Sequence, residues 1–168
     1  MSTERQLLTQ WAETVGCYQY LHQRAFQQYQ IIRYVLGAPI IILSTVAGVL
    51  NFASTTLDPV RLGVALGSLN LVVAVLSSME KFFTVTELAE GHRSATISYD
   101  KLYRRITVEL SMPEPNPRLM EMIQTSRLEM DKLMEQSPFI PANIIRDIAN
   151  DERFKTIQLP NIVRVQDL

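Results

Sequence analysis

Two long runs without a formal charge constrain this 168-residue chain more than any other feature of its sequence. No Asp, Glu, Lys or Arg occurs in residues 34–57 or in residues 62–79. A helix needs roughly 20 apolar residues to cross a hydrocarbon core of about 30 Å. The first run has that length, and the second reaches it once the Lys81 ammonium extends to the headgroups. The runs predict transmembrane helices at about 34–55 and 61–80.

The connection between the two runs is short and turn-forming. It has the sequence STTLDPV over residues 54–60, with Asp58 and Pro59 at its centre, and Asp-Pro favours a turn. Two adjacent spans with so short a connection form an antiparallel hairpin. The alternative is a hairpin buried in a soluble helical bundle, but covering both helices on all sides requires a larger protein than this one.

The charges beside the runs predict an orientation. Arg24, Arg33, Lys81 and Arg93 lie on one side of the hairpin, and Arg61 alone lies on the other. Because cytoplasmic flanks are enriched in Lys and Arg, we expect both termini in the cytoplasm or its topological equivalent. About thirty polar-patterned residues precede the first run, which is not the pattern of a cleaved signal peptide.

Outside the runs, apolar residues recur at alternating three- and four-residue steps. This is the a/d spacing of helices that pack along a seam. The three stripes are Leu8, Trp11, Val15, Tyr18, His22, Ala25, Tyr29 and Ile32; then Val85, Leu88, His92, Ala95, Tyr99, Leu102 and Ile106; then Leu119, Ile123, Ser126, Met130 and Leu133. No proline occurs between the second run and Pro113, so the second span is expected to continue as one long helix.

These patterns predict an all-α protein, a two-helix transmembrane hairpin continuous with an antiparallel cytosolic helical bundle. Residues 1–33 form its first cytosolic helix, 34–80 the hairpin, 81–136 the helices that complete the bundle, and 137–168 a short helix and an extended C-terminal arm. Asn116 and Pro117 are expected to start the third cytosolic helix, and Ser137-Pro138 to end it.

The short helix is expected to begin at Pro141 or Ala142 and to run to about Asn150. Its isoleucines dock on the bundle or on a partner. The arm 155–168 has no helical stripe and offers a surface for a protein partner.

Two histidines are expected to meet in a polar layer of the seam. His22 lies eleven residues before Arg33, and His92 lies eleven residues after Lys81. Both therefore stand about 16 Å from the membrane edge at 1.5 Å per residue, with Tyr18 beside Thr96 and Val15 beside Tyr99 at the next levels. Three roles remain open: a hydrogen-bonded layer that fixes register, a pH-sensing pair, or a metal site completed by a carboxylate such as Glu87 or Glu90.

Small and amide residues in the spans are candidates for packing or for lining a pore. Gly48, Gly63 and Gly67 would let helices approach closely in lipid. Asn51 and Asn70 need partners there, either as a structural hydrogen bond or as the lining of a polar path through an oligomer. No charge lies inside either span, which argues against a proton relay. A channel would need several copies.

The sequence contains no pattern typical of catalysis. A phosphate-binding glycine loop, an H-E-x-x-H motif and a G-x-S-x-G turn are all absent. Cys17 is the only cysteine, so no intrachain disulfide or thiolate cluster can form, and a buried structural thiol is expected. With a net charge of −1 the chain has no basic field for nucleic acid. We expect no enzyme, cofactor or metal.

The order of these segments resembles a known family. The resemblance is carried by YLHQRAFQQY, PIIILSTVAGVLNF, a second span with Gly and Asn, and above all ELAEGHRSATISYDKLYRRI, over about residues 15–145. The chain is similar to the SLATT family, the SMODS and SLOG-associating two-transmembrane effector domains, and LEMDKLMEQSPFIP is similar to the version in large DNA viruses. The resemblance implies two membrane helices with cytosolic helices, no catalytic site, and an oligomeric effector that perturbs membranes or forms pores.

Two functions therefore stay open. One is an oligomeric membrane effector, in which the glycines, Asn51 and Asn70 face a lumen. The other is a structural anchor, such as a virion membrane protein that tethers a protein shell or complex to the bilayer through the bundle surface and the tail 150–168.

Overall fold

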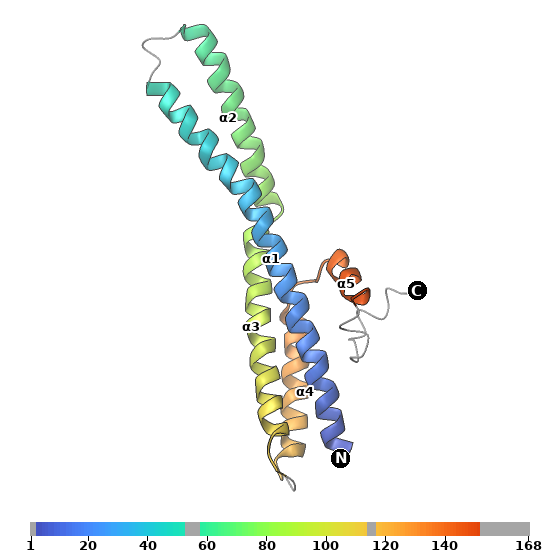
Figure 1. Ribbon diagram of the computed structural model, residues 1–168. Helices are drawn as coiled ribbons and strands as arrows, with labels where there is room; N and C mark the ends of the chain where they lie inside the picture. The colour runs from blue at the N-terminus through green and yellow to red at the C-terminus, as the bar shows by residue number, and fades with distance from the viewer. Residues whose placement is uncertain (1–2, 53–57, 114–116, 152–168) are drawn as a thin grey trace. The chain divides into compact units, whose positions relative to one another are not determined.

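The described part of the chain is helical and contains no strand. The computed structural model describes residues 3–52, 58–113 and 117–151. Its helices are α1 (Thr3–Phe52), α2 (Pro59–Phe82), α3 (Val85–Leu110), α4 (Leu119–Gln136) and α5 (Ala142–Ala149) (Figure 1). The all-α class is confirmed. The arm expected at 155–168 and residues 54–57 of the expected connection lie outside the described residues.

The chain divides into two compact units. Unit 1 comprises residues 1–27 and 89–168, and unit 2 comprises residues 28–88. The first half of α1 and nearly all of α3 therefore belong to unit 1 together with α4 and α5. Unit 2 contains the rest of α1, all of α2 and the first turn of α3.

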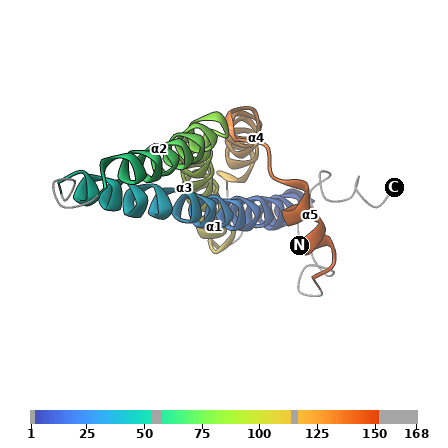
Figure 2. The same ribbon diagram turned by 90° about the horizontal axis from the view of Figure 1, so that it is seen from above.

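Unit 1 has a core formed by side chains of three helices. Figures 1 and 2 show α4 beside α1 and α3 in this unit. The buried members of the core are Leu8, Ala12, Val15, Ala95, Tyr99, Leu102, Ile106 and Met122, with Trp11, Ile123 and Met130 among the half-buried residues packed against them. Most belong to the a/d stripes. Each large apolar side chain that is fully buried contributes roughly 1.5–3 kcal/mol, so this core is what holds the three helices together.

A second cluster attaches α5 to α1. Ile144, Ile145 and Ile148 of α5 are buried against Cys17 and its neighbours on α1, and the cluster comprises Cys17, Leu21, Ala25, Ile144, Ile145 and Ile148. The three isoleucines lie on one face of the helix at spacings of one and three residues. The expected docking of this short helix is therefore within the chain rather than on a partner.

The expected single helix after the second span is wrong, because the chain breaks between α2 and α3. Phe83 and Thr84 form a turn, in which the Phe83 amide donates to the Met79 carbonyl and the Thr84 amide to the Lys81 carbonyl. Thr84 has φ 45°, a left-handed conformation that is strained for a β-branched residue. Neither Gly nor Pro stands at this point, so the sequence gives no local signal for the break.

The beginnings of α2 and α4 also differ from expectation. Asp58 caps α2, since its carboxylate accepts from the Val60 amide at 3.1 Å, and Pro59 follows as the first helical residue. Asp-Pro thus starts a helix instead of centring a turn. The helix expected from Asn116 or Pro117 begins later, at Leu119, with no side-chain cap on Arg118. Asn116 itself lies outside the described residues.

Two glycines give a matched test of packing in unit 1. A Cβ added at Gly91 in α3 would lie 2.7 Å from Pro138 Cγ, whereas one added at Gly16 in α1 would lie 3.4 Å from the Tyr103 ring. The proline ring cannot rotate away. We expect Gly91→Ala to lower the free energy of unfolding by about 1–3 kcal/mol through overpacking, despite better helix propensity.

Gly16→Ala is the control, and it should raise the free energy of unfolding by up to about 1 kcal/mol through helix propensity. Urea unfolding followed by circular dichroism measures both variants. Equal destabilisation in the two variants would contradict the contact between Pro138 and α3.

Candidate functional site

Four aromatic rings from α1 and α3 stack inside unit 1. His22 and His92 meet through their Nδ1 atoms at 2.9 Å, and their ring centroids are 5.1 Å apart. The centroid of the Tyr99 ring lies 5.4 Å from that of His22 and 5.4 Å from that of Tyr18, and the ring is nearly parallel to both. The structure therefore brings all four residues of the expected polar seam into one cluster, which we call the ring stack: Tyr18, His22, His92 and Tyr99.

The Tyr99 ring contacts more than the level expected for it. Val15, its expected neighbour, belongs to the same core cluster, and the ring also stacks on Tyr18 and His22. Thr96, expected beside Tyr18, donates its hydroxyl to the His92 carbonyl of its own helix at 2.9 Å. Side chains on a helix point back toward its N-terminus, so the long Tyr99 ring reaches the level of the histidines that precede it on α3.

Burial keeps both histidines neutral. His22 is 1% exposed and His92 is 0% exposed. Burial, and then the charge of His92, lowers the pKa of His22 from 6.5 to about 4, and burial lowers the pKa of His92. An Nδ1–Nδ1 hydrogen bond requires one ring to carry the proton and the other to accept it. The neutral pair satisfies this condition.

Ser137 and Pro138 contact the ring stack or α3, and the heptad pattern does not identify either residue. The Ser137 side chain makes a hydrogen bond with Tyr99, which opposes the larger effect of burial in raising the Tyr99 pKa to about 12. Pro138 packs on the α3 backbone at Gly91, the residue before His92. Both lie in the linker after α4. The only sequence signal there is the Ser-Pro pair that ends a helix.

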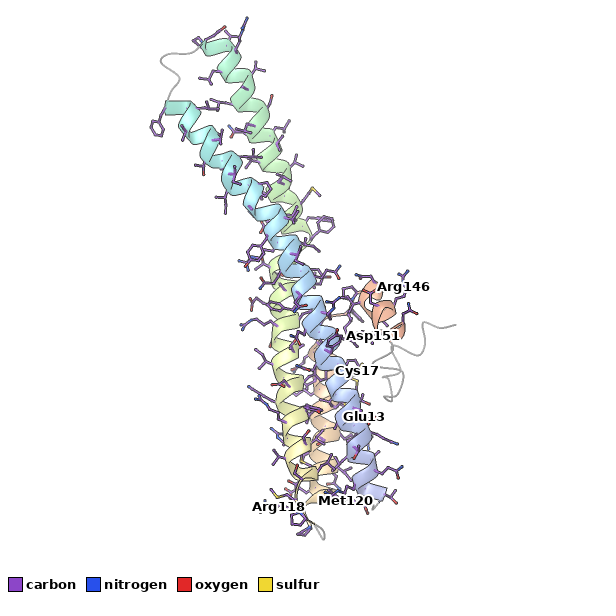
Figure 3. The ribbon with its side chains drawn as sticks, viewed as in Figure 1. Glu13, Cys17, Arg118, Met120, Arg146 and Asp151 are labelled. Carbon is purple, nitrogen blue, oxygen red and sulfur yellow. The ribbon has the colours of Figure 1, made fainter. Side chains whose placement is uncertain are left out.

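The single thiol of the chain lies under α5. Cys17 is 2% exposed and belongs to the cluster that joins α1 and α5 (Figure 3). Burial raises its pKa to about 11. A thiol that stays protonated and covered is a poor nucleophile and a poor metal ligand, which agrees with the structural role expected from the sequence.

Unit 2 carries two distinct stripes on each of its helices. Buried or half-buried residues recur every three or four positions and form what we call the contact stripe: Leu36, Ile40, Leu43, Ala47 and Leu50 on α1, and Leu62, Leu66, Leu69, Val73 and Leu76 on α2. One residue further along lies an exposed small-residue stripe: Ser44, Gly48 and Asn51 on α1, and Gly63, Gly67, Asn70 and Ala74 on α2.

The small-residue stripe contains all the residues that the sequence identifies as candidates for close packing or pore lining, namely Gly48, Asn51, Gly63, Gly67 and Asn70. A Cβ added at Gly48, Gly63 or Gly67 would have no neighbouring heavy atom within 4 Å. Among the described residues, neither Asn51 nor Asn70 makes a side-chain hydrogen bond. In the part of the chain that the structure describes, therefore, these residues do not pack the two helices of unit 2 against each other.

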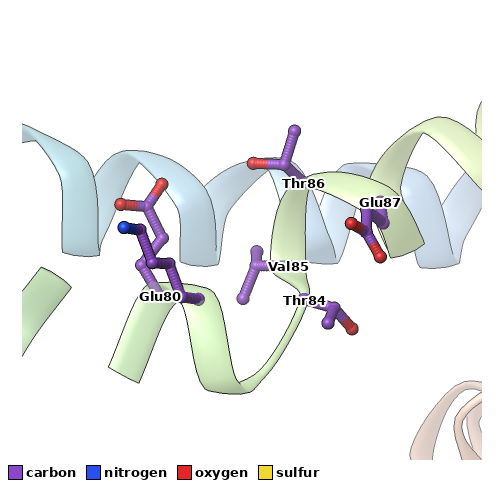
Figure 4. A pocket seen from close by; sticks show the side chains of 6 residues that line it. Glu80, Thr84, Val85, Thr86 and Glu87 are labelled. Carbon is purple, nitrogen blue, oxygen red and sulfur yellow. The ribbon is translucent and has the colours of Figure 1, made fainter. Parts of the chain in front are cut away.

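A mixed pocket lies at the break between α2 and α3. It has a volume of about 420 Å³ and is lined by Glu80, Lys81, Thr84, Val85, Thr86 and Glu87 (Figure 4). A neighbouring apolar hollow on α2 has a volume of about 530 Å³ and includes Phe82 and Phe83. Neither contains a nucleophile paired with a base, so we assign no chemistry to them.

The carboxylates named for a metal site are not grouped with the histidines. Among residues 3–52, 58–113 and 117–151, no three His, Cys, Asp or Glu side chains lie close enough to hold a metal ion. Glu90 instead accepts from the Arg93 guanidinium at 2.8 Å, and Glu87 lines the mixed pocket.

Comparison of the chain with protein-family models, with curated proteins and with solved structures finds no match.

The histidine pair predicts how stability depends on pH. Because the folded chain holds these rings neutral, the unfolded chain binds more protons below pH 6.5. The contribution of the neutral histidine pair to the free energy of unfolding is therefore complete above pH 6.5 and is lost as the pH falls toward 4. For His22 alone the loss is on the order of 3 kcal/mol. Urea unfolding at pH 8, 6.5, 5 and 4.5 measures it.

Replacing both rings, as in His22→Leu with His92→Leu, removes donor and acceptor together and should flatten this part of the profile. The single variants should change stability or its pH dependence. If neither single variant departs from the parent profile between pH 5 and pH 8, the histidines do not form the buried pair described here.

Proposed function

We propose that the chain is a non-enzymatic, two-pass integral membrane protein. In this proposal unit 2 crosses the bilayer as an antiparallel hairpin, and unit 1 forms a helical bundle in the cytoplasm with both termini. Two helical stretches, Thr3–Phe52 and Pro59–Leu110, are long and apolar enough to span a membrane by length and composition.

The observation that carries the proposal is the exposure of these apolar segments. In the most apolar 18-residue window of each stretch, only 6% of the residues are buried. The core helix of a soluble protein would be mostly covered. Exposed apolar side chains here include Ile41, Ile42, Val49, Phe52, Val64 and Leu71, each at least 60% exposed. A patch this continuous requires a partner or a membrane, and uncharged segments of this length favour the membrane.

The two stripes of unit 2 give the hairpin one distinct side. Successive residues of a helix are about 100° apart, so each small-residue stripe is rotated by that angle from the contact stripe of its helix. In both helices the small-residue stripe follows the contact stripe by one residue, so it is rotated in the same sense when each helix is viewed along its own chain direction. The contact stripes of the two helices face each other, and the helices run in opposite directions. The rotation therefore places both small-residue stripes on the same side of the hairpin.

That side suits contact with further copies of the chain. Asn70 is at the middle of α2, twelfth of its 24 residues, and so would lie near the centre of the bilayer. An amide there is costly when it faces lipid, whereas glycine and alanine permit close approach of another helix. A ring of hairpins that turn this side inward would place Asn70 beside a polar path, and the glycines would allow the helices to pack tightly.

The resemblance to SLATT effectors supports the same function. We therefore propose an oligomeric effector that forms pores or perturbs the bilayer. The structural anchor remains the alternative. It uses the same hairpin but requires neither leakage nor a role for Asn70 beyond packing.

Dye release from liposomes tests this proposal. The purified chain, reconstituted at increasing density, should release a trapped dye of a few hundred daltons. Asn70→Leu removes the central amide and is expected to reduce release at least tenfold while leaving insertion unchanged. Flotation of the liposomes on a density gradient checks the insertion.

Ser68→Ala is the matched control, because the Ser68 hydroxyl already donates to the Val64 carbonyl of its own helix at 2.9 Å. Its release should equal that of the parent chain. Absence of release at every density would favour the anchor, and equal release by Asn70→Leu would remove Asn70 from the path.

A further inference from the structure

Three features of unit 1 that the membrane proposal does not use are connected to one another. The first is the His22–His92 hydrogen bond of 2.9 Å between α1 and α3. The second is the linker after α4, where Ser137 bonds to Tyr99 and Pro138 packs at Gly91. The third is α5, which this linker carries.

The linker touches the ring stack directly. Tyr99 is stacked on His22 at 5.4 Å, and Gly91 is the immediate neighbour of His92. Any rearrangement of the two histidines therefore changes the surface on which Ser137 and Pro138 rest. Because α5 begins at Ala142, only a few residues separate that surface from the helix.

On the other side, α5 covers α1 on both sides of the same histidine. Its isoleucines pack on Leu21, the residue before His22, and on Ala25, one turn later, as well as on Cys17. The helix has only 8 residues, too few to be stable in water alone. Its attachment therefore depends on tertiary contacts, among them this apolar cluster, and on the position of the linker.

We propose that α5 is a latch on α1, closed at neutral pH and opened by acidification, with the His22–His92 hydrogen bond as its trigger. The inference concerns regulation within unit 1, and it holds whether or not unit 2 enters a bilayer.

The protonation chemistry of the pair makes it suitable as a trigger. In the neutral pair one Nδ1 carries a hydrogen and the other accepts it. A first proton from solvent can add at the Nε2 of the donor ring, which keeps the bond but leaves a buried cation. A second proton must add at the accepting Nδ1. Both facing nitrogens then carry hydrogen, and the bond is lost.

Among the residues that the structure describes, no buried anion offsets these charges. The buried polar or charged residues among those described are His22, His92 and Ser126. The other titratable groups around the pair are Tyr18, Tyr99 and Cys17, whose raised pKa values keep them neutral in acid as well. The Tyr99 face can attract one imidazolium, but it provides no counter-charge.

Many charged side chains on the elements around the pair are exposed to solvent: Arg24 on α1, Glu90 and Arg93 on α3, Lys132 and Glu135 on α4, and Arg146 and Asp147 on α5. The carboxylates of Glu13 on α1, Asp100 on α3, Glu129 on α4 and Asp151 after α5 are half-buried. Hydration weakens the effect of the exposed charges on a buried ring. Opening α5 and its linker would admit water to the imidazolium rings without requiring the separate α1–α3–α4 core to unfold.

The chain contains its own pair of reporters for this motion. Cys17, the only cysteine, lies under α5, and Trp11, the only tryptophan, packs against the α1–α3–α4 core. Labelling of Cys17 by dithiodipyridine therefore reports on the latch, while Trp11 fluorescence reports on the core. The experiment uses the full chain in detergent, and rates are normalised to the urea-unfolded chain at the same pH.

We expect protection of Cys17 to fall by about 30-fold from pH 7.5 to pH 5, the effect of moving one histidine pKa between 6.5 and about 4. The Trp11 emission should stay constant over this range. In the variant His22→Leu with His92→Leu, protection should be the same at both pH values. In Ile145→Ser it should be low at both, which establishes that α5 is what covers the thiol.

Constant protection in the parent chain would overturn the latch. An equal fall in the double histidine variant would overturn the trigger. A fall that coincides with a shift of Trp11 emission would mean that the whole core unfolds, and the latch would again be excluded. Because the assay contains no liposomes, its failure is distinguishable from failure of the pore.

Discussion

Apolar side chains that no other part of the chain covers must have a solvent other than water. In unit 2 this requirement applies to most of the circumference of two helices, since the buried or half-buried residues of 34–52 and 59–79 are the contact stripe together with Gly37, Pro39 and Ser77. The absence of charge over 34–57 and 62–79 is consistent with lipid as that solvent. The proposed function follows from this constraint. If lipid surrounds the hairpin, its small-residue side can pack against other hairpins in the same membrane.

Unit 1 differs from unit 2, because its apolar side chains form a covered core and its charged side chains lie mostly at the surface. Its three-helix core contains a polar layer, the ring stack, in which two neutral histidines share a hydrogen bond, and one further buried polar residue among those described, Ser126 on α4. Such a layer fixes the register of α1 against α3, because a shift by one turn would separate the two buried imidazoles and break the hydrogen bond between them. It also connects the core to the linker and to α5. The same residues can thus specify structure and respond to pH.

The parts of the fold that follow from periodicity could be predicted from the sequence. Leu8, Val15, Tyr99 and Ile106 are buried where the a/d stripes put them, and the two histidines meet. The break at Thr84 could not be predicted, since a β-branched residue in a left-handed conformation has no sequence signal. Ser137 was also missed, because its role depends on a tertiary contact with Tyr99. The stripes of unit 2 required the burial pattern, since glycine spacing alone does not say which face the partner helix occupies.

The central claim is that lipid surrounds the two helices of unit 2, and extraction of membranes with alkaline carbonate tests it most directly. The chain is expressed in cells, and the membranes are washed at pH 11 without detergent and then sedimented. The account predicts that the chain remains in the pellet and is released only by detergent. Recovery of the chain in the supernatant would contradict it, and would mean that protein rather than lipid covers these helices.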